Sequence, residues 1–397
     1  MIVVGARCAG SSVAMLLARL GHRVLILDRN AFPSDRLAST HMVWHSGVEH
    51  LLRWGLLDRL RATGCPAMRN FNLDLGELVL TGHAPPADGI AEAYAPRRFV
   101  LDDLLLAAAR EAGAEVRTRC SVRDLVVDDD RVAGVRYADE RGAMHEERAS
   151  LVIGADGERS TVARLVGAAS YDVQGRIGGT IWAYFSSLPI DDMEFYARPG
   201  RMVYAWRTNE DLTVAGICFP FADFRAALGD RGATMHAELD AFAPALGERV
   251  RAAKRVSRWR TGCASSFCRA PVGRGWCLLG DAGLTMDPIT AAGITNAFRD
   301  ASLLAELVGE GLADDLDSAL ANFQECRDAL SVSLYQFTSE MARLAPPTQE
   351  TIDFFVGLHE SQEDTNRYFG VFAQTVPVSE FFAPENVQRI SAARAPA

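Results

Sequence analysis

The feature that most constrains this chain is a strand, a glycine loop, a helix and a second strand within its first 28 residues. Residues 1–4 predict a short apolar strand, Gly5–Gly10 the loop, residues 11–20 a helix with apolar periodicity, and residues 23–28 a second strand that ends in an acid. A β-α-β unit of this kind is typical of an α/β fold that binds a nucleotide.

The loop offers specific groups to a dinucleotide. Gly5 and Gly10 take the outer glycine positions, and Arg7 stands where the usual pattern has a middle glycine. The helix N-terminus presents N–H groups to a pyrophosphate, and Asp28 can accept hydrogen bonds from ribose hydroxyls. Arg7 either contacts the pyrophosphate or points to solvent, and Arg29, next to the acid, joins the expected cofactor-binding residues. An ordinary strand-to-helix turn is the alternative.

A Gly-Asp-Ala motif at residues 280–282 predicts a second cofactor contact. Asp281 follows an apolar strand and could accept from hydroxyl groups of an extended cofactor. Pro288 stiffens the approach to Gly293, which begins a helix whose N–H groups could face a cofactor group that gains negative charge. A Gly-Ala-Asp-Gly motif lies at residues 154–157.

With these three motifs, the first 310 residues resemble the para-hydroxybenzoate hydroxylase-like flavoproteins, the group A FAD-dependent monooxygenases and oxidoreductases. The resemblance implies one extended FAD and a transient approach of NADPH near residues 156–157. It also implies cofactor contacts near the phosphates, the adenine and the flavin. The residues expected to bind the cofactor are Gly5, Arg7, Gly10, Asp28, Arg29, Thr40, His41, Arg98, Val122, Asp156, Gly157, Arg164, Gly280, Asp281, Pro288, Gly293 and Ile294.

The resemblance implies insertion of one oxygen atom, by hydroxylation or epoxidation through a C4a-hydroperoxyflavin, into a hydrophobic aromatic or alkene substrate. Molecular oxygen is then a co-substrate, and electrons come from NAD(P)H or from a separate flavin reductase. No general base is evident, and the catalytic candidates are His41, Tyr204 and Trp206. Aromatic side chains could keep the pocket dry. They are Trp182, Tyr184, Phe185, Phe195, Tyr204, Trp206 and Phe219.

Two other functions stay open. Tyr204-Ala205-Trp206 matches part of a geranylgeranyl reductase motif, which favours reduction of isoprenoid double bonds as the first alternative. A non-enzymatic flavin-binding protein is the second, with a partner surface on C-terminal helices that include Phe354, Phe355 and Tyr368. A halogenase is disfavoured because the Trp-x-Trp-x-Ile-Pro signature is absent and the one lysine, Lys254, lies far from the flavin motifs.

The pattern along the chain predicts an α/β fold with a Rossmann-like FAD-binding domain, an inserted antiparallel sheet for the substrate, and C-terminal helices. Within it we expect a helix at residues 45–63, a helix at 104–112 with Asp102 as its N-cap, and a sheet at 175–260 with one face covered. The expected divisions are residues 1–70, 95–174 and 262–314 for FAD, 71–94 and 175–261 for the sheet, and 315–397 for the helical region.

Charge and cysteine usage limit the partners. The formal net charge of −10 argues against nucleic acid, and the basic run at residues 249–260 is interpreted as a solvated face. No apolar run is long enough to predict a membrane span. The eight cysteines lack metal-type spacing, so we expect no metal site and a reducing, cytoplasmic location.

Overall fold

A six-stranded sheet contains the N-terminal glycine loop. The computed structural model describes residues 1–34, 39–311 and 315–392. The strand order is β18-β19-β9-β1-β2-β5, and all neighbours are parallel except β18 and β19. The strands are β1 (Ile2–Val4), β2 (Leu25–Asp28), β5 (Glu115–Thr118), β9 (Val152–Gly154), β18 (Val272–Gly273) and β19 (Trp276–Leu278).

Helices cover this sheet. The apolar face of α1 (Cys8–Arg19) is buried between α4 (Arg98–Glu111) and α9 (Gly293–Gly311), and α2 (His45–Arg53) packs on α9. Long helices thus cover one face of the first sheet, and its other face packs against apolar side chains of residues 120–137. Two short helices complete this part, α3 (Leu57–Ala62) and α5 (Thr161–Leu165).

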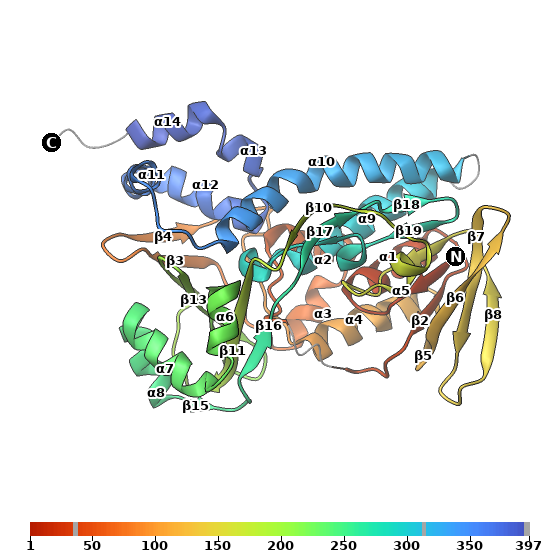
Figure 1. Ribbon diagram of the computed structural model, residues 1–397, viewed down its shortest axis with the longest axis horizontal. Helices are drawn as coiled ribbons and strands as arrows, with labels where there is room; N and C mark the ends of the chain where they lie inside the picture. The colour runs from red at the N-terminus through yellow and green to blue at the C-terminus, as the bar shows by residue number, and fades with distance from the viewer. Residues whose placement is uncertain (35–38, 312–314, 393–397) are drawn as a thin grey trace.

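Two three-stranded sheets flank the first one. An antiparallel meander at one end of the molecule comprises β6 (Ser121–Asp128), β7 (Arg131–Ala138) and β8 (Met144–Arg148) (Figure 1). The predicted hairpin at residues 128–130 joins β6 to β7. The other sheet comprises β10 (Ser170–Gly175), β17 (Ser266–Arg269) and β20 (Leu284–Thr285).

An eight-stranded sheet forms the second large layer, in the order β15-β11-β14-β13-β12-β3-β4, with β16 also paired to β11. All its pairs are antiparallel except β12 with β3. Residues 70–83 therefore join the sheet that the sequence placed mainly at 175–260. The strands are β3 (Asn70–Asp74), β4 (Val79–His83), β11 (Gly178–Ser186), β12 (Met193–Arg198), β13 (Arg201–Thr208), β14 (Leu212–Pro220), β15 (Lys254–Arg255) and β16 (Arg260–Gly262).

Both faces of the large sheet are buried, so the expectation of one covered face was wrong. Ile181, Ala183 and Phe185 share one face, as predicted, and pack on three helices that the sequence analysis missed. These helices are α6 (Phe221–Ala227), α7 (Arg231–Phe242) and α8 (Pro244–Ala252). Because alternate strand residues face opposite sides, Trp182 faces the C-terminal helices instead.

The chain after residue 315 is helical, as predicted. In Figure 1, α10 (Leu316–Ala342) runs along the molecule and leads to a group of helices beside β3 and β4. Residues 312–314 and 393–397 of the predicted divisions, and 35–38 of the predicted loop, lie outside the described residues. The remaining helices are α11 (Gln349–His359), α12 (Gln362–Ala373), α13 (Val378–Phe381) and α14 (Pro384–Ala392).

Two predicted helices differ from the observed ones in where they begin and end. The expected helix at residues 45–63 is two helices, α2 and α3, because Gly55 adopts a positive φ of 71° between them. Asp102 is not an N-cap, since α4 begins four residues earlier at Arg98. An acidic residue before an apolar run fits the N-cap pattern, but Asp102 lies within the helix and its side chain bonds Arg7 and Arg98.

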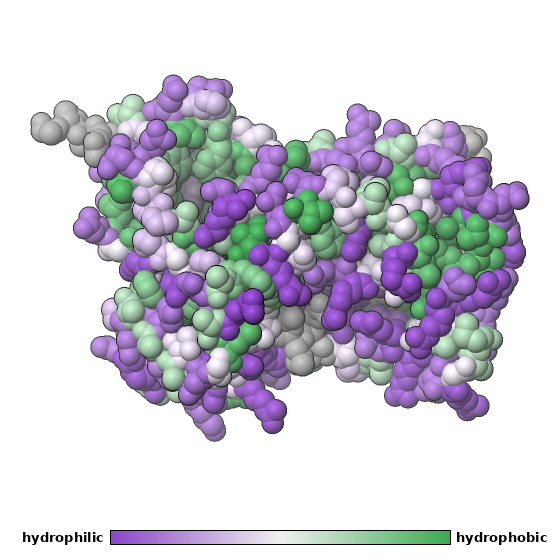
Figure 2. All heavy atoms as spheres, viewed as in Figure 1, coloured by the Kyte–Doolittle hydropathy of each residue, from purple (hydrophilic) through white to green (hydrophobic). Residues whose placement is uncertain are grey.

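Hydrophilic side chains predominate on the face shown in Figure 2, and hydrophobic ones gather in separate patches. Among the described helices, none is both long enough and apolar enough to cross a bilayer. The apolar residues are concentrated instead in buried clusters between the layers.

Candidate active site

One cavity of about 1750 Å³ extends from the glycine loop to the C-terminal helices. Among the predicted residues, Gly10 lies buried under the loop and Arg164 is exposed on α5, and neither lines the cavity. The catalytic candidates Tyr204 and Trp206 do line it. So do Gly5, Arg7, Asp28, Arg29, Thr40, His41, Arg98, Val122, Asp156, Gly157, Gly280, Asp281, Pro288, Gly293 and Ile294.

Asp28, Asp156 and Asp281, the acids of the three motifs, all line this cavity. Asp28 is buried at the end of β2, where its Oδ2 accepts from the Ala6 backbone N–H at 2.8 Å. Its Oδ1 accepts from the Asn30 backbone N–H at 2.7 Å. Asp28 therefore fixes the glycine loop to β2, and it also lines the cavity.

Asp156 organises the start of α5. Its Oδ1 accepts from the Ser160 hydroxyl at 2.5 Å, and its Oδ2 accepts from the Thr161 backbone N–H at 2.6 Å. Burial raises the pKa of Asp156, and these hydrogen bonds only partly oppose that effect. Arg164 lies near the other end of α5, which explains its separation from the cavity.

The glycine loop needs its two outer glycines. Gly5 has a positive φ of 106°, and a Cβ on Gly10 would overlap the Gly5 carbonyl oxygen. At the middle position, the Arg7 guanidinium donates to Asp102 Oδ2 at 2.5 Å and to the Ser34 hydroxyl at 3.0 Å. The side chain of Arg7 is thus bonded across the loop to α4 instead of extending into solvent.

Asp102 is the centre of a buried cluster that the sequence analysis did not identify. Arg98 donates to its Oδ1 through Nη2 at 2.8 Å and through Nε at 3.1 Å, and the Cys8 thiol contacts the same oxygen at 3.3 Å. Burial lowers the pKa of Arg98, but attraction to Asp102 and the other partners outweighs it and the net pKa is raised. The four-residue spacing of Arg98 and Asp102, one helical turn, is the sequence signal that could have identified this ion pair.

The turn before α9 faces the middle of the cavity. Asp287 accepts from the backbone N–H groups of Gly178 and Ile289 at 3.0 and 3.1 Å, and burial raises its pKa to about 6. The turn η2 (Pro288–Thr290) follows. Gly293 then begins α9, and a Cβ there would meet no protein atom within 4 Å. Its backbone therefore faces open cavity.

His41 lines the cavity and is buried in an uncommon backbone conformation. Its φ is 75°, and its Nε2 is hydrogen-bonded to the Tyr184 hydroxyl. Burial lowers the pKa of His41 well below its ordinary value, and the charges of Arg98, Arg97 and Arg260 lower it further. His41 is therefore neutral at physiological pH and is not poised to act as a cation.

The part of the cavity beyond the η2 turn is a chamber with aromatic walls. Of the predicted aromatic wall, Trp182, Phe195, Tyr204 and Trp206 line it, whereas Tyr184, Phe185 and Phe219 do not. Phe185 and Phe219 lie on the opposite face of the sheet, because side chains alternate along a strand. Tyr184 lies on the inner face but beyond the cavity, where it contacts His41.

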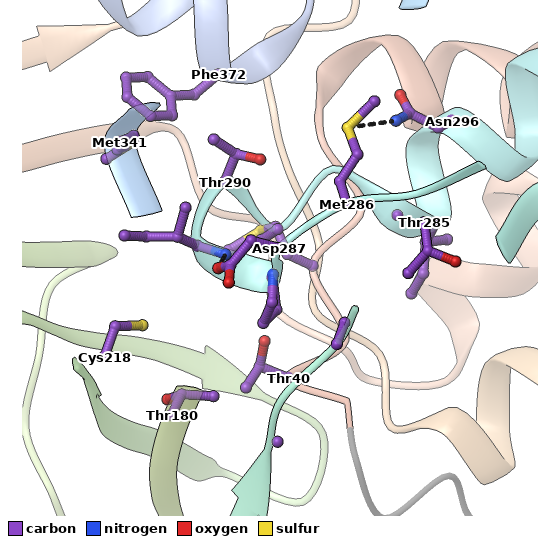
Figure 3. Close-up of a pocket in the computed structure, with 18 of the residues that line it drawn as sticks. Thr40, Thr180, Cys218, Thr285, Met286, Asp287, Thr290, Asn296, Met341 and Phe372 are labelled. Carbon is purple, nitrogen blue, oxygen red and sulfur yellow. Dashed lines mark hydrogen bonds between the residues drawn. The ribbon is translucent and has the colours of Figure 1, made fainter. Parts of the chain in front are cut away.

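The roof of this chamber comes from the C-terminal helices. Phe354 and Tyr368 are buried there, and Phe355 lines the same wall, so these residues do not form the exposed partner surface considered above. Figure 3 shows Met341 and Phe372 on one side of the turn that carries Asp287 and Thr290, and Thr180 and Cys218 on the other. The apolar roof residues are Phe337, Met341, Phe354, Phe355, Tyr368, Phe369, Phe372 and Phe382.

The arrangement fits an FAD with room for a second molecule. Typical ligand pockets enclose about 300–1,000 Å³, and this cavity is larger than one such ligand needs. The glycine loop and the Gly293 helix start leave backbone exposed to the cavity, and carboxylates line the groove between them. These are the groups that a dinucleotide's phosphates and hydroxyls require.

Comparison with known proteins gives relatives of several activities. The chain is 36% identical over 173 residues to "Digeranylgeranylglycerophospholipid reductase 2" of Methanopyrus kandleri, a match that covers 42% of this chain and 39% of that protein. It is 27% identical over 320 residues to "6-methylpretetramide 4-monooxygenase" of Streptomyces rimosus, covering 78% and 75%. A "flavoprotein/dehydrogenase" structure from Cytophaga hutchinsonii has a TM-score of 0.86 at 18% identity, covering 99% of each chain, which shows a shared fold.

The family comparison agrees with the geometry of the cavity. The FAD binding domain model matches residues 1–338, which include all three glycine-acid motifs and the aromatic strands of the large sheet. The chain therefore belongs to the FAD binding domain family and is an FAD-dependent oxidoreductase.

Proposed function

We propose that this protein is an FAD-dependent monooxygenase that inserts one oxygen atom into a hydrophobic aromatic or alkene substrate. The observation that carries the proposal is the continuity of the cavity, which leads from the three carboxylates into a chamber lined by aromatic side chains. Oxygen insertion by a flavin requires that water be kept from the reacting atoms, and an apolar lining favours this.

In this proposal the cofactor-side residues hold the FAD. Asp28 would hold the ribose, the loop at Gly5 the pyrophosphate, Asp281 the ribityl chain and the backbone at Gly293 the flavin ring. When bound, FAD would supply two-electron redox chemistry and the activation of oxygen. The chain's own contribution would be to orient the cofactor toward the chamber and to keep water away. His41, buried and neutral, would line the site without adding charge.

The electron balance of this reaction requires a donor of two electrons. One oxygen atom enters the substrate, and the other leaves as water with two electrons and two protons from NAD(P)H and solvent. We propose either direct hydride transfer from NAD(P)H at the open side of the groove or delivery by a separate flavin reductase. Anaerobic mixing with NADPH or NADH distinguishes the two, because only direct transfer bleaches the flavin absorbance without another protein.

Reduction of isoprenoid double bonds is the second candidate. It is favoured by the similarity to the Methanopyrus reductase and by Tyr204 and Trp206, which match part of a reductase motif and line the chamber. Halogenation is less well supported, since Lys254 is exposed on β15 and does not line the cavity.

Product mass tests these candidates. The FAD-loaded protein is supplied with oxygen, NADPH or chemically reduced flavin, and either 2-naphthol or geranylgeraniol. A monooxygenase adds one oxygen atom to a probe and consumes oxygen in step with product. A reductase adds two hydrogen atoms to geranylgeraniol and works without oxygen. Absence of turnover with both probes by either route would reject these two substrate classes.

A further inference from the structure

The turn that precedes α9 is held by Trp44, the residue just before α2. The indole Nε1–H of Trp44 donates to the Thr290 carbonyl at 2.9 Å, and its backbone N–H donates to the Thr295 hydroxyl at 3.0 Å. Thr290 is the last residue of η2, and Thr295 lies in the first turn of α9. Trp44 is therefore bonded on both sides of the short segment, residues 291–293, that leads into α9.

Close packing of α2 on α9 keeps Trp44 at this turn. A Cβ on Gly47 in the first turn of α2 would lie 2.8 Å from the Thr295 hydroxyl oxygen, so a side chain there would force the two helices apart. Trp44 is only 2% exposed, and its ring stacks on Phe71 with a centroid distance of 5.6 Å. The indole is thus confined, and its N–H keeps one direction.

The bond from Trp44 fixes the orientation of one peptide group. Because a peptide is planar and trans, the Thr290 carbonyl and the Ala291 N–H point in opposite directions. The carbonyl accepts from Trp44, while the Ala291 N–H donates to the Pro288 carbonyl at 2.9 Å. Ala291 itself has a positive φ of 52°, which is unfavourable for a residue with a side chain. Hydrogen bonds on both sides of the peptide hold Ala291 in this conformation.

The residues that follow present backbone N–H groups to the cavity. The first N–H groups of a helix have no partner within it, and no other described residue accepts from the N–H groups of residues 292–295. Gly293, among them, faces open cavity. These groups carry the partial positive charge of the helix N-terminus. A flavin ring gains negative charge when it is reduced, so N–H groups directed at the ring favour reduced FAD over oxidised FAD.

We propose that Trp44 positions the start of α9 against the flavin and thereby sets how strongly the protein prefers reduced FAD. This role rests on the placement of the flavin ring at Gly293 in the proposed function, and it applies equally to oxygen insertion and to double-bond reduction. Trp44 acts through the Thr290 carbonyl. Without the indole N–H, this carbonyl loses its donor, and the N–H groups that follow it are no longer held toward the ring.

Trp44→Phe tests this role, because phenylalanine keeps an aromatic ring against Phe71 but has no N–H. Spectroelectrochemical titration of bound FAD and of free FAD gives the ratio of the dissociation constants of the oxidised and reduced forms. We expect the preference for reduced FAD to fall about three- to tenfold, which corresponds to one hydrogen bond. Loss of packing alone would weaken both forms equally and leave the ratio unchanged. Urea unfolding of the apoprotein measures the effect on the fold separately.

Trp54→Phe is the matched control. Trp54 is buried at the other end of α2, packs on Phe298 of α9 at a ring-centroid distance of 5.1 Å and does not line the cavity. This variant should keep the wild-type ratio. If Trp44→Phe does not fold, Thr295→Val takes its place, because it removes the acceptor of the Trp44 backbone N–H and Thr295 does not line the cavity. It should lower the ratio in the same direction.

The role of Trp44 is overturned if the variant that folds keeps the wild-type ratio, or if Trp54→Phe lowers the ratio as much. These binding results are independent of turnover. A lowered ratio in a protein that forms no oxygenated product would reject the proposed reaction and keep the role of Trp44. An unchanged ratio in a protein that does oxygenate a probe would reject the role of Trp44 and keep the reaction.

Discussion

The guanidinium of Arg7 donates to Asp102 Oδ2 at 2.5 Å, joining the residue before α1 to the fifth residue of α4. Arg7 occupies the position where a dinucleotide loop usually has a glycine, so a side chain there must leave the path of the phosphates. Asp102 binds the guanidinium and so holds it toward α4, away from the expected position of the phosphates. The same carboxylate also pairs with Arg98, so two cations depend on one buried acid.

Asp102→Ala should therefore lower both stability and FAD affinity. Removing one partner of a buried ion pair typically costs about 3–5 kcal/mol, since the remaining charges stay without compensation. Urea unfolding of the apoprotein and titration with FAD measure the two effects. Asp103→Ala is the matched control, because Asp103 is the exposed neighbour on the same helix. Equal behaviour of the two variants would contradict this role for Asp102.

Two glycines that line or underlie the cofactor groove should respond differently to substitution. Gly293→Val places its side chain in open cavity, so the apoprotein should keep its thermal stability while FAD binding weakens by at least tenfold. Gly10→Ala instead overlaps the Gly5 carbonyl and should destabilise the apoprotein itself. Thermal unfolding with and without FAD separates the outcomes. An unstable Gly293→Val apoprotein would show that its position is filled by protein.

Asp287 should make stability depend on pH. Its folded pKa of about 6 lies above the ordinary value of 3.8, so the folded protein binds more protons than the unfolded chain between these values. Stability should thus rise as the pH falls from 7 to 4.5, by up to about 2 kcal/mol from this group. Asp287→Asn should remove that increment. The check is the unfolding free energy of both proteins across this range, and parallel pH curves would refute the assignment.

Phe369 should be needed for the chamber but not for the cofactor groove. Its ring stacks on Phe71 of β3 at a centroid distance of 4.7 Å, which joins α12 to the sheet. Phe369→Ala removes this contact and should cost about 3–5 kcal/mol of stability. In conditions where the variant stays folded, its FAD affinity should match the wild type while its affinity for 2-naphthol falls. A parallel loss of FAD would mean that the two parts of the cavity are not independent.

The groove with the carboxylates was predictable because the glycines and acids that form it stand next to strands in the sequence. Gly5, Asp28 and Asp281 follow predicted strands directly, and parallel strands bring such ends to one edge, which the structure confirms by placing all three acids of the motifs in one cavity. Arg164 shows that a residue close to a family motif in the sequence need not lie in the groove. It follows the second motif closely in sequence, yet α5 carries it away from the groove.

The chamber could not be predicted, because its contacts are distant in sequence. A helical pattern shows that Phe354 and Tyr368 share an apolar face with their neighbours, but not whether that face meets a core, a partner or a ligand cavity. Asp102 was misassigned for a similar reason. Its position before an apolar run satisfies the cap pattern, whereas its contact with Arg7 joins residues 95 positions apart.

Two stretches of chain form different parts of the cavity. The groove with the carboxylates is complete by the start of α9, while the aromatic roof is supplied only after residue 315. Under the proposed function, mutations in the last fifth of the sequence should change which compounds the chamber admits while the groove with the carboxylates stays as it is. Chimeras in which the C-terminal helices of one relative replace those of another would show the same division.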